Sequence, residues 1–152
     1  MILWTGQYRL SHPARIDITR AGCNALTRAG KPAPGAILAP SADLLAWGLG
    51  ARQRAGKDPV ALAAVWARYE ADYLVEVAER IAKDRRPLDA LLALPEVVAC
   101  CYCGPEYAKI GHCHRFPGAR VLVAEGADYR GEMAVPEAPK TARQLDLFGG
   151  LR

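Results

Sequence analysis

Residues 100–115 bring together four of the five cysteines of the chain, two histidines and an arginine. Thiolates act as nucleophiles and imidazoles move protons. The same two groups are the ligands that zinc prefers. This segment is therefore the part of the chain best equipped for thiol chemistry or for metal binding.

Cys113 has the surroundings expected of a reactive thiol. The residues after it predict a helix, and the unpaired amide groups at a helix start stabilise an anion. His114 would move the proton of this thiol, and the permanent charge of Arg115 would bind a phosphate or carboxylate. Cys101 or Cys103 would be its resolving partner. On this interpretation the site is catalytic and belongs to a thiol-dependent enzyme acting on a nucleotide or nucleic acid.

Two other interpretations of the same residues stay open. In one, Cys101, Cys103, Cys113 and His112 hold a zinc ion in tetrahedral geometry. In the other, the small thiols only pack in the core, while the histidines and the arginine make local hydrogen bonds. The spacing matches no standard zinc knuckle, so the sequence does not choose among the three.

The order of these motifs resembles a known family. The resemblance depends on Cys101-Tyr102, on Cys113-His114-Arg115 at a helix start, and on Gly126 and Gly131-Glu132. These residues are similar to the domain-of-unknown-function family 488, small α/β proteins in which a strand ends in Cys-Tyr and the next helix opens with Cys-His-Arg. The resemblance covers most of residues 1–132 and implies Cys101, Cys113, His114 and Arg115 as the site. It supplies no established reaction.

One departure from that family affects the expected chemistry. Members commonly have Glu two residues after the first Cys of the motif, where this chain has Cys103. Loss of this carboxylate weakens a general acid or base role at the position and favours the zinc interpretation.

The charge distribution suggests what the site would bind. Residues 1–57 contain eight Lys or Arg against two Asp, a net charge of +6, whereas the whole chain has +4. A basic half favours phosphate or nucleic acid as a partner. Thr5, Tyr8 and Arg20, from the first two predicted strands, are expected to join Arg115 as ligand-binding residues.

Strands and helices are predicted to alternate along the chain. Strands are expected at residues 2–8, 15–19, 36–39 and 97–102, and helices at 41–47, 58–81, 87–92 and 119–125. The aromatic residues of the longest helix, including Tyr69 and Tyr73, are expected in the core. We therefore expect one α/β domain over residues 1–132, three-layer-like, with a small mostly parallel sheet flanked by helices.

A flexible tail is expected over residues 133–152, because its first part has two prolines and no apolar period. Near its end lie Gln144, Leu145, Asp146, Leu147 and Phe148. This pentapeptide resembles the motif by which bacterial polymerases and repair proteins dock on the DNA polymerase sliding clamp. Apolar anchors with a polar rim are typical of such short motifs. The alternative is that this peptide folds back on its own domain.

Together these features predict a cytoplasmic protein of DNA metabolism, without membrane segments, that the tail recruits to the sliding clamp. Its Cys, His and Arg pocket would take a nucleotide or nucleic acid. Two alternatives remain: a clamp-binding modulator of replication without catalysis, and a zinc-stabilised module that binds nucleic acid.

Overall fold

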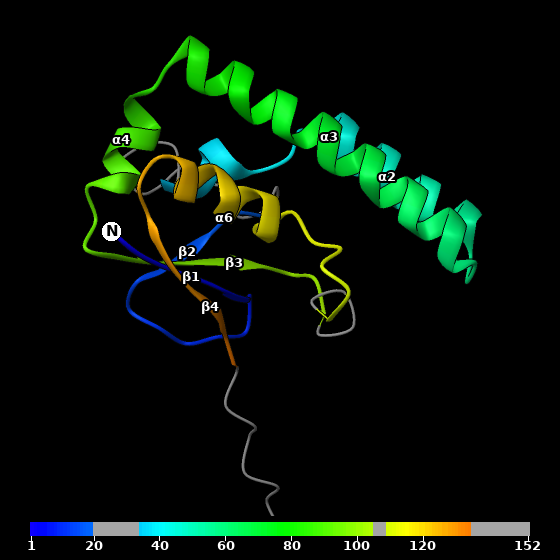
Figure 1. Ribbon diagram of the computed structural model, residues 1–152, viewed down its shortest axis with the longest axis horizontal. Coiled ribbons are helices and arrows are strands. Elements are labelled where there is room, and N and C mark those ends of the chain that lie inside the picture. The colour runs from blue at the N-terminus through cyan, green and yellow to red at the C-terminus, as the bar shows by residue number, and fades with distance from the viewer. Residues whose placement is uncertain (20–33, 105–108, 135–152) are drawn as a thin grey trace, which may run out of the picture.

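The computed structural model describes residues 1–19, 34–104 and 109–134. Strands and helices alternate along these residues (Figure 1). The elements are β1 (Ile2–Gln7), β2 (Arg15–Asp17), the 3₁₀ helix η1 (Pro34–Leu38), α2 (Ala42–Ala55), α3 (Pro59–Lys83), α4 (Arg86–Leu92), β3 (Glu96–Cys101), α6 (Arg115–Ala124) and β4 (Asp128–Met133). The predicted α/β class is confirmed.

The four strands are parallel and form one sheet in the order β2-β3-β1-β4. β3 lies inside the sheet, and residues 97–101 of this strand are all buried. Such a continuous apolar run is typical of a strand covered on both faces. Since β1 and β3 run in the same direction, their carboxyl ends meet at one edge of the sheet. Cys101 lies at this edge, which is where parallel sheets usually bind ligands.

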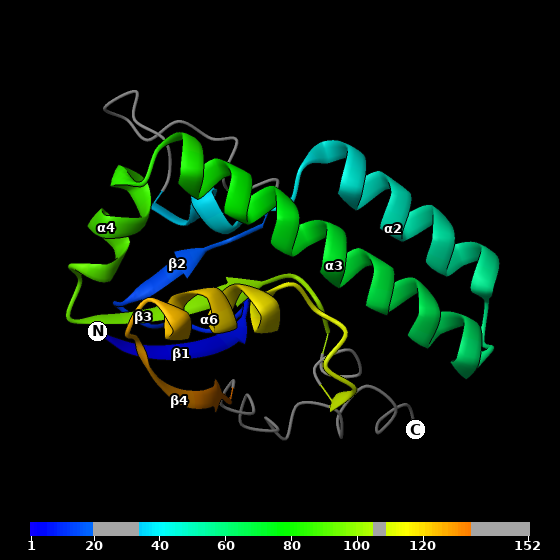
Figure 2. The same cartoon turned by 45° about the horizontal axis from the view of Figure 1, so that its top comes forward.

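The helices lie on one side of the sheet (Figures 1 and 2). On this side Leu3 and Val97 from the strands share one apolar core with Tyr73 of α3 and Leu122 of α6. The covering layer on the other side is a loop, residues 8–14, that joins β1 to β2. Leu10 from this loop packs against Val98 and Cys100 of β3.

Local sequence explains where the two long helices begin. Ser41 caps α2 by accepting a hydrogen bond from the backbone N–H of Leu44, and Asp58 caps α3 in the same way from Val60. Proline at the first position of α3 costs nothing, because that N–H has no helical partner. Tyr69 and Tyr73 are buried as expected, and the hydroxyl of Tyr73 donates to the carbonyl of Leu38 (2.7 Å).

Several elements differ from the expectation. The helix expected at residues 41–47 continues to Ala55 as α2, and the helix expected at residues 119–125 begins at Arg115 as α6. The strand predicted at residues 36–39 is wrong, because residues 34–38 form η1. A Cβ atom on Gly35 would lie 2.1 Å from the carbonyl oxygen of Asp17, so this segment is shaped by its packing against β2. β4 was not predicted, since most of its residues are exposed and polar. Within the described ranges, no helix has both the length and the apolar character needed to cross a membrane.

Candidate metal and thiol site

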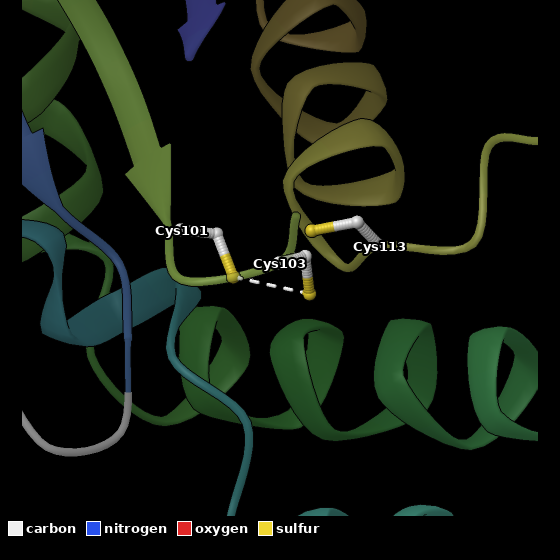
Figure 3. Close-up of side chains that lie close together, drawn as sticks. All are labelled: Cys101, Cys103 and Cys113. Atoms are coloured by element: carbon white, nitrogen blue, oxygen red, sulfur yellow. Dashed lines mark hydrogen bonds between the residues drawn. The ribbon is translucent and has the colours of Figure 1, made fainter. Parts of the chain in front are cut away.

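Three cysteine side chains meet between the end of β3 and the start of α6 (Figure 3). Cys101 is the last residue of β3, Cys103 follows it in the loop, and Cys113 lies two residues before α6. Their three sulfur atoms all lie within 4.8 Å of one another, and those of Cys101 and Cys103 are 3.6 Å apart. Four ligands placed tetrahedrally at the zinc–sulfur bond length put neighbouring sulfurs about 3.8 Å apart. The three thiols therefore fit a soft metal ion with small adjustments.

The neighbouring thiols and burial decide which sulfur is best suited to be a thiolate. Hydrogen bonds with Cys101 and then Cys113 hold the pKa of Cys103 well below its usual range. A hydrogen bond with Cys103 raises the pKa of Cys101 to about 12. Burial raises the pKa of Cys113. Cys103 is thus the thiol whose pKa is lowered, and it is also the least buried of the three, whereas the sequence predicted the reactive thiol at Cys113.

His114 faces this cluster from the start of α6 and is itself buried. Its Nε2 atom lies 3.0 Å from the carbonyl oxygen of Ile18, so this nitrogen donates. Burial lowers the pKa of His114, which favours the neutral ring, so Nδ1 is the acceptor nitrogen and accepts from the thiol of Cys101. Nδ1 lies 3.7 Å from the sulfur of Cys101. A ring held at one nitrogen by a backbone carbonyl, with its other nitrogen turned toward the ligand cluster, is the usual arrangement of a metal-binding histidine.

Arg115 is fully buried, with 0% of its side chain exposed, and it contacts the segment that carries the thiols. Its Nε donates to Oε2 of Glu132 (3.2 Å), while Nη2 lies 2.9 Å from Oε1 without the alignment of a hydrogen bond. Nη1 donates to the carbonyl of Cys103 (3.4 Å) and to the sulfur of Cys113 (3.5 Å). Arg115 thus ties β4 to the loop of the thiols.

Thr5 completes this network from β1. Its hydroxyl donates to Oε2 of Glu132 (2.6 Å) and lies 2.9 Å from the hydroxyl of Tyr129. Thr5 and Glu132 are direct neighbours in the register of β1 and β4. The Thr5 side chain is 0% exposed, so its part in the described structure is to hold Glu132 against Arg115.

A pocket of about 660 Å³ opens beside the thiols. Its walls come from α2, α3 and the segments on either side of residues 105–108, and its lining is mostly apolar. Charged, aromatic and thiol side chains interrupt this apolar lining, among them Arg52, Trp66, Tyr69, Cys101, Cys103, Cys113 and His114. Arg115, Thr5 and Tyr8 are not among the residues that line it.

The remaining predicted site residues lie in different places. The ring of His112 stacks on that of Trp66, with centroids 5.3 Å apart, and lines the pocket. Among the described residues, the ligand atoms that all lie within 4.8 Å of one another are the three sulfurs, so neither His112 nor His114 belongs to this group, and Nδ1 of His114 is close to the sulfur of Cys101. Tyr8 stacks on Tyr102 at the edge of the sheet. Arg20 and the peptide at residues 144–148 lie outside the described residues.

Sequence reasoning did not assign a site role to Glu132, Tyr129 or Trp66. Glu132 appeared only as part of the family resemblance, and its pairing with Arg115 depends on the register of a strand that was not predicted. Trp66 was placed in the aromatic stripe of the long helix. A stripe of this kind indicates a buried face, and it carries no sign that one of its members also lines a pocket.

The chain was compared with known proteins in three ways. No family model, curated protein or solved structure matches it.

Proposed function

We propose that the protein binds a zinc ion through Cys101, Cys103, Cys113 and Nδ1 of His114. The observation that supports this most strongly is the meeting of three sulfurs within 4.8 Å at the end of a pocket. All three thiols and His114 line that pocket, so a metal ion held by them would be reachable by a ligand. A metal ion in such a position would act as a Lewis acid, or as a structural ion that links the end of β3 to the start of α6.

We further propose that the pocket takes a nucleotide or one nucleotide of a nucleic acid. The apolar walls and the aromatic rings of Trp66 and Tyr69 suit a planar base, and Arg52 lines the same space with a positive charge suited to phosphate. Arg115, which the sequence suggested for this role, is buried against Glu132. The pentapeptide at residues 144–148 would bring this activity to the sliding clamp, a role in DNA metabolism.

Metal content tests the central step of this proposal. Protein purified without chelator should contain about one zinc per chain, and Cys103→Ser and Cys113→Ser should each lose most of it. Cys100→Ser is the matched control, because Cys100 is as buried as Cys113 but packs with Leu10 on the opposite face of the sheet. Metal-free protein from zinc-supplemented cells, or equal zinc in all variants, would refute the site.

Nucleotide binding tests the second step. Titration calorimetry with mononucleotides should show binding that Arg52→Gln weakens, whereas binding of the matching nucleosides should change little. Arg54→Gln is the control, because Arg54 is an exposed arginine on the same helix and is not part of the pocket lining. Equal effects of the two variants would exclude Arg52 as the phosphate contact.

A thiol-dependent enzyme is the second candidate. Cys103 is only partly buried and lines the pocket, and the sulfur of Cys101 lies 3.6 Å away as a resolving thiol. This candidate predicts metal-free protein in which iodoacetamide modifies Cys103 before Cys101 and Cys113. A zinc-loaded protein whose thiols resist alkylation until a chelator is added would favour the metal site instead.

A further inference from the structure

Tyr102 is an exposed aromatic residue held in a fixed position. It lies between Cys101 and Cys103 in the chain, and 57% of it is exposed. Its ring stacks on the ring of Tyr8, with centroids 3.9 Å apart and planes 27° apart. The two tyrosines directly follow the carboxyl ends of β3 and β1, two neighbouring parallel strands. The sheet itself therefore brings the two rings together.

Arg15 extends this stack on the other side of Tyr8. The guanidinium carbon of Arg15 lies 4.3 Å from the centre of the Tyr8 ring. One face of a ring has room for only one planar group at such a distance, so Tyr8 lies between Arg15 and Tyr102. Within residues 1–19, 34–104 and 109–134, no further ring stacks on the outer face of Tyr102, and this face loses little conformational freedom when another ring is added.

The chemistry around this stack favours a nucleobase over other flat groups. Every base has a π-face, and stacking on tyrosine is a common means of holding single strands. Arg15 belongs to the stack, Arg9 is exposed nearby in the chain, and residues 1–57 have a net charge of +6. A phosphate backbone complements this charge, whereas an uncharged proline-rich peptide gains nothing from it.

We infer that the outer face of Tyr102 is a stacking platform for a base of a single-stranded nucleic acid. Tyr102 also lines the pocket beside the thiols, so the nucleotide next to the stacked base lies within reach of that pocket. This inference rests on the proposed function only for the identity of the ligand in the pocket. The platform adds a second contact next to that pocket.

Fluorescence anisotropy tests the platform with the full-length protein, purified without chelator, and a fluorescein-labelled oligo(dT) of about 12 nucleotides at low salt. Tyr102→Leu should weaken binding by about fivefold or more, the factor that corresponds to the lower end of base stacking on an aromatic ring. Tyr102→Phe keeps the π-face and should bind within about twofold of the wild type. Val75→Ala is the matched control, because Val75 on α3 is also 57% exposed, and it should change nothing.

Three results would overturn the inference. The first is that the wild type does not bind oligo(dT), and the second is that Tyr102→Leu binds it as tightly as the wild type does. The third is that the wild type and Tyr102→Leu each bind duplex DNA as tightly as single-stranded DNA. A polyproline peptide that displaces the oligonucleotide gives a different outcome. If Tyr102→Leu then weakened binding of this peptide and left binding of the oligonucleotide unchanged, the surface would be assigned to protein recognition. Zinc content and mononucleotide affinity are measured on the same samples. If the wild type contained no zinc or bound no mononucleotide, while Tyr102→Leu still weakened binding of oligo(dT), the proposed function would be refuted and the inferred platform would be kept.

Discussion

The ion pair between Arg115 and Glu132 predicts a stability effect at the scale of one residue. Glu132→Gln removes the charge that neutralises a guanidinium with no exposed surface, while Glu132 itself is 31% exposed. Breaking a fully buried pair costs about 3–5 kcal/mol, and partial solvent access reduces this, so we expect a loss of about 2 kcal/mol in the free energy of unfolding. Urea unfolding followed by circular dichroism measures it.

The same strand offers the control for that variant. Asp128 pairs with Arg130 on β4, and both side chains are more than half exposed. Asp128→Asn should change the free energy of unfolding by less than about 0.5 kcal/mol. If Glu132→Gln were as mild as Asp128→Asn, Arg115 would have to be stabilised chiefly by its contacts with Cys103 and Cys113.

His114 predicts the direction of a pH effect. Burial lowers its pKa, and the hydrogen bond to the carbonyl of Ile18 opposes this only in part. The unfolded chain therefore binds a proton more readily than the folded chain below the ordinary histidine pKa of about 6.5. Stability is fully present above this pH and falls as the pH drops from there toward the lowered pKa of the folded state.

Urea midpoints measured between about pH 7.5 and 5 in the presence of a chelator show this slope without a contribution from metal release. His114→Asn should remove most of it. His112→Asn should remove less, because burial also lowers the pKa of His112 but its ring is only partly buried. A slope that survives unchanged in His114→Asn would assign the effect to other groups.

At the scale of elements, the contact between α2 and α3 depends on one glycine. A Cβ atom on Gly48 would lie 2.6 Å from Cδ2 of Tyr69, a ring that is itself buried. Gly48→Ala must push the two helices apart, so we expect a loss of about 1–3 kcal/mol. In Gly50→Ala, on the same helix, the new Cβ meets only the flexible end of Arg54 at 3.3 Å, and a gain of about 0.5–1 kcal/mol is expected.

Thermal unfolding of these two variants decides whether the pocket wall is tightly packed. Gly48 and Tyr69 both line the pocket. Gly48→Ala should therefore also weaken mononucleotide binding. Equal melting temperatures for Gly48→Ala and Gly50→Ala would mean that α2 and α3 can separate freely at this point.

Elements with strong local signals could be predicted from the sequence. The caps at Ser41 and Asp58 predicted where α2 and α3 begin, the helical spacing of apolar residues predicted the length of α3, and the apolar run at residues 97–101 predicted a strand inside the sheet. The second half of α2, which follows Gly48 and Gly50, was not predicted. β4 and η1 could not be predicted in this way. β4 is held by backbone pairing with β1, and η1 by its fit against Asp17, so both depend on contacts that are distant in sequence.

The site shows the same division. Proximity in sequence was enough to group Cys101, Cys103 and Cys113, because a strand end and the next helix start meet at one edge of a parallel sheet. Which thiol is buried depends on packing that the sequence does not show. The pairing of Arg115 with Glu132 depends on the register of β1 and β4, so an arginine suggested for ligand binding is used to hold the loop instead.

At the scale of the whole molecule, zinc binding and clamp binding are expected to be separable. The thiols lie in the domain, and β4 ends at Met133, eleven residues before Gln144 in the sequence. A chain ending at Arg143 should therefore keep its zinc and lose affinity for a purified bacterial sliding clamp. Cys103→Ser in the full-length chain should do the reverse.

Surface plasmon resonance with immobilised clamp measures the second property. Full-length protein should bind with a dissociation constant in the micromolar range, as expected for so small an interface. Replacing Gln144 and Phe148 together with Ala should abolish binding, because this removes an apolar anchor and the amide at its rim. A double substitution of Lys140 and Arg143 with Ala, in the same tail but outside the pentapeptide, is the control and should have a small, salt-dependent effect. Binding that survives the loss of Phe148 would show that the pentapeptide is not the anchor, and the thiol site would then be the remaining guide to function.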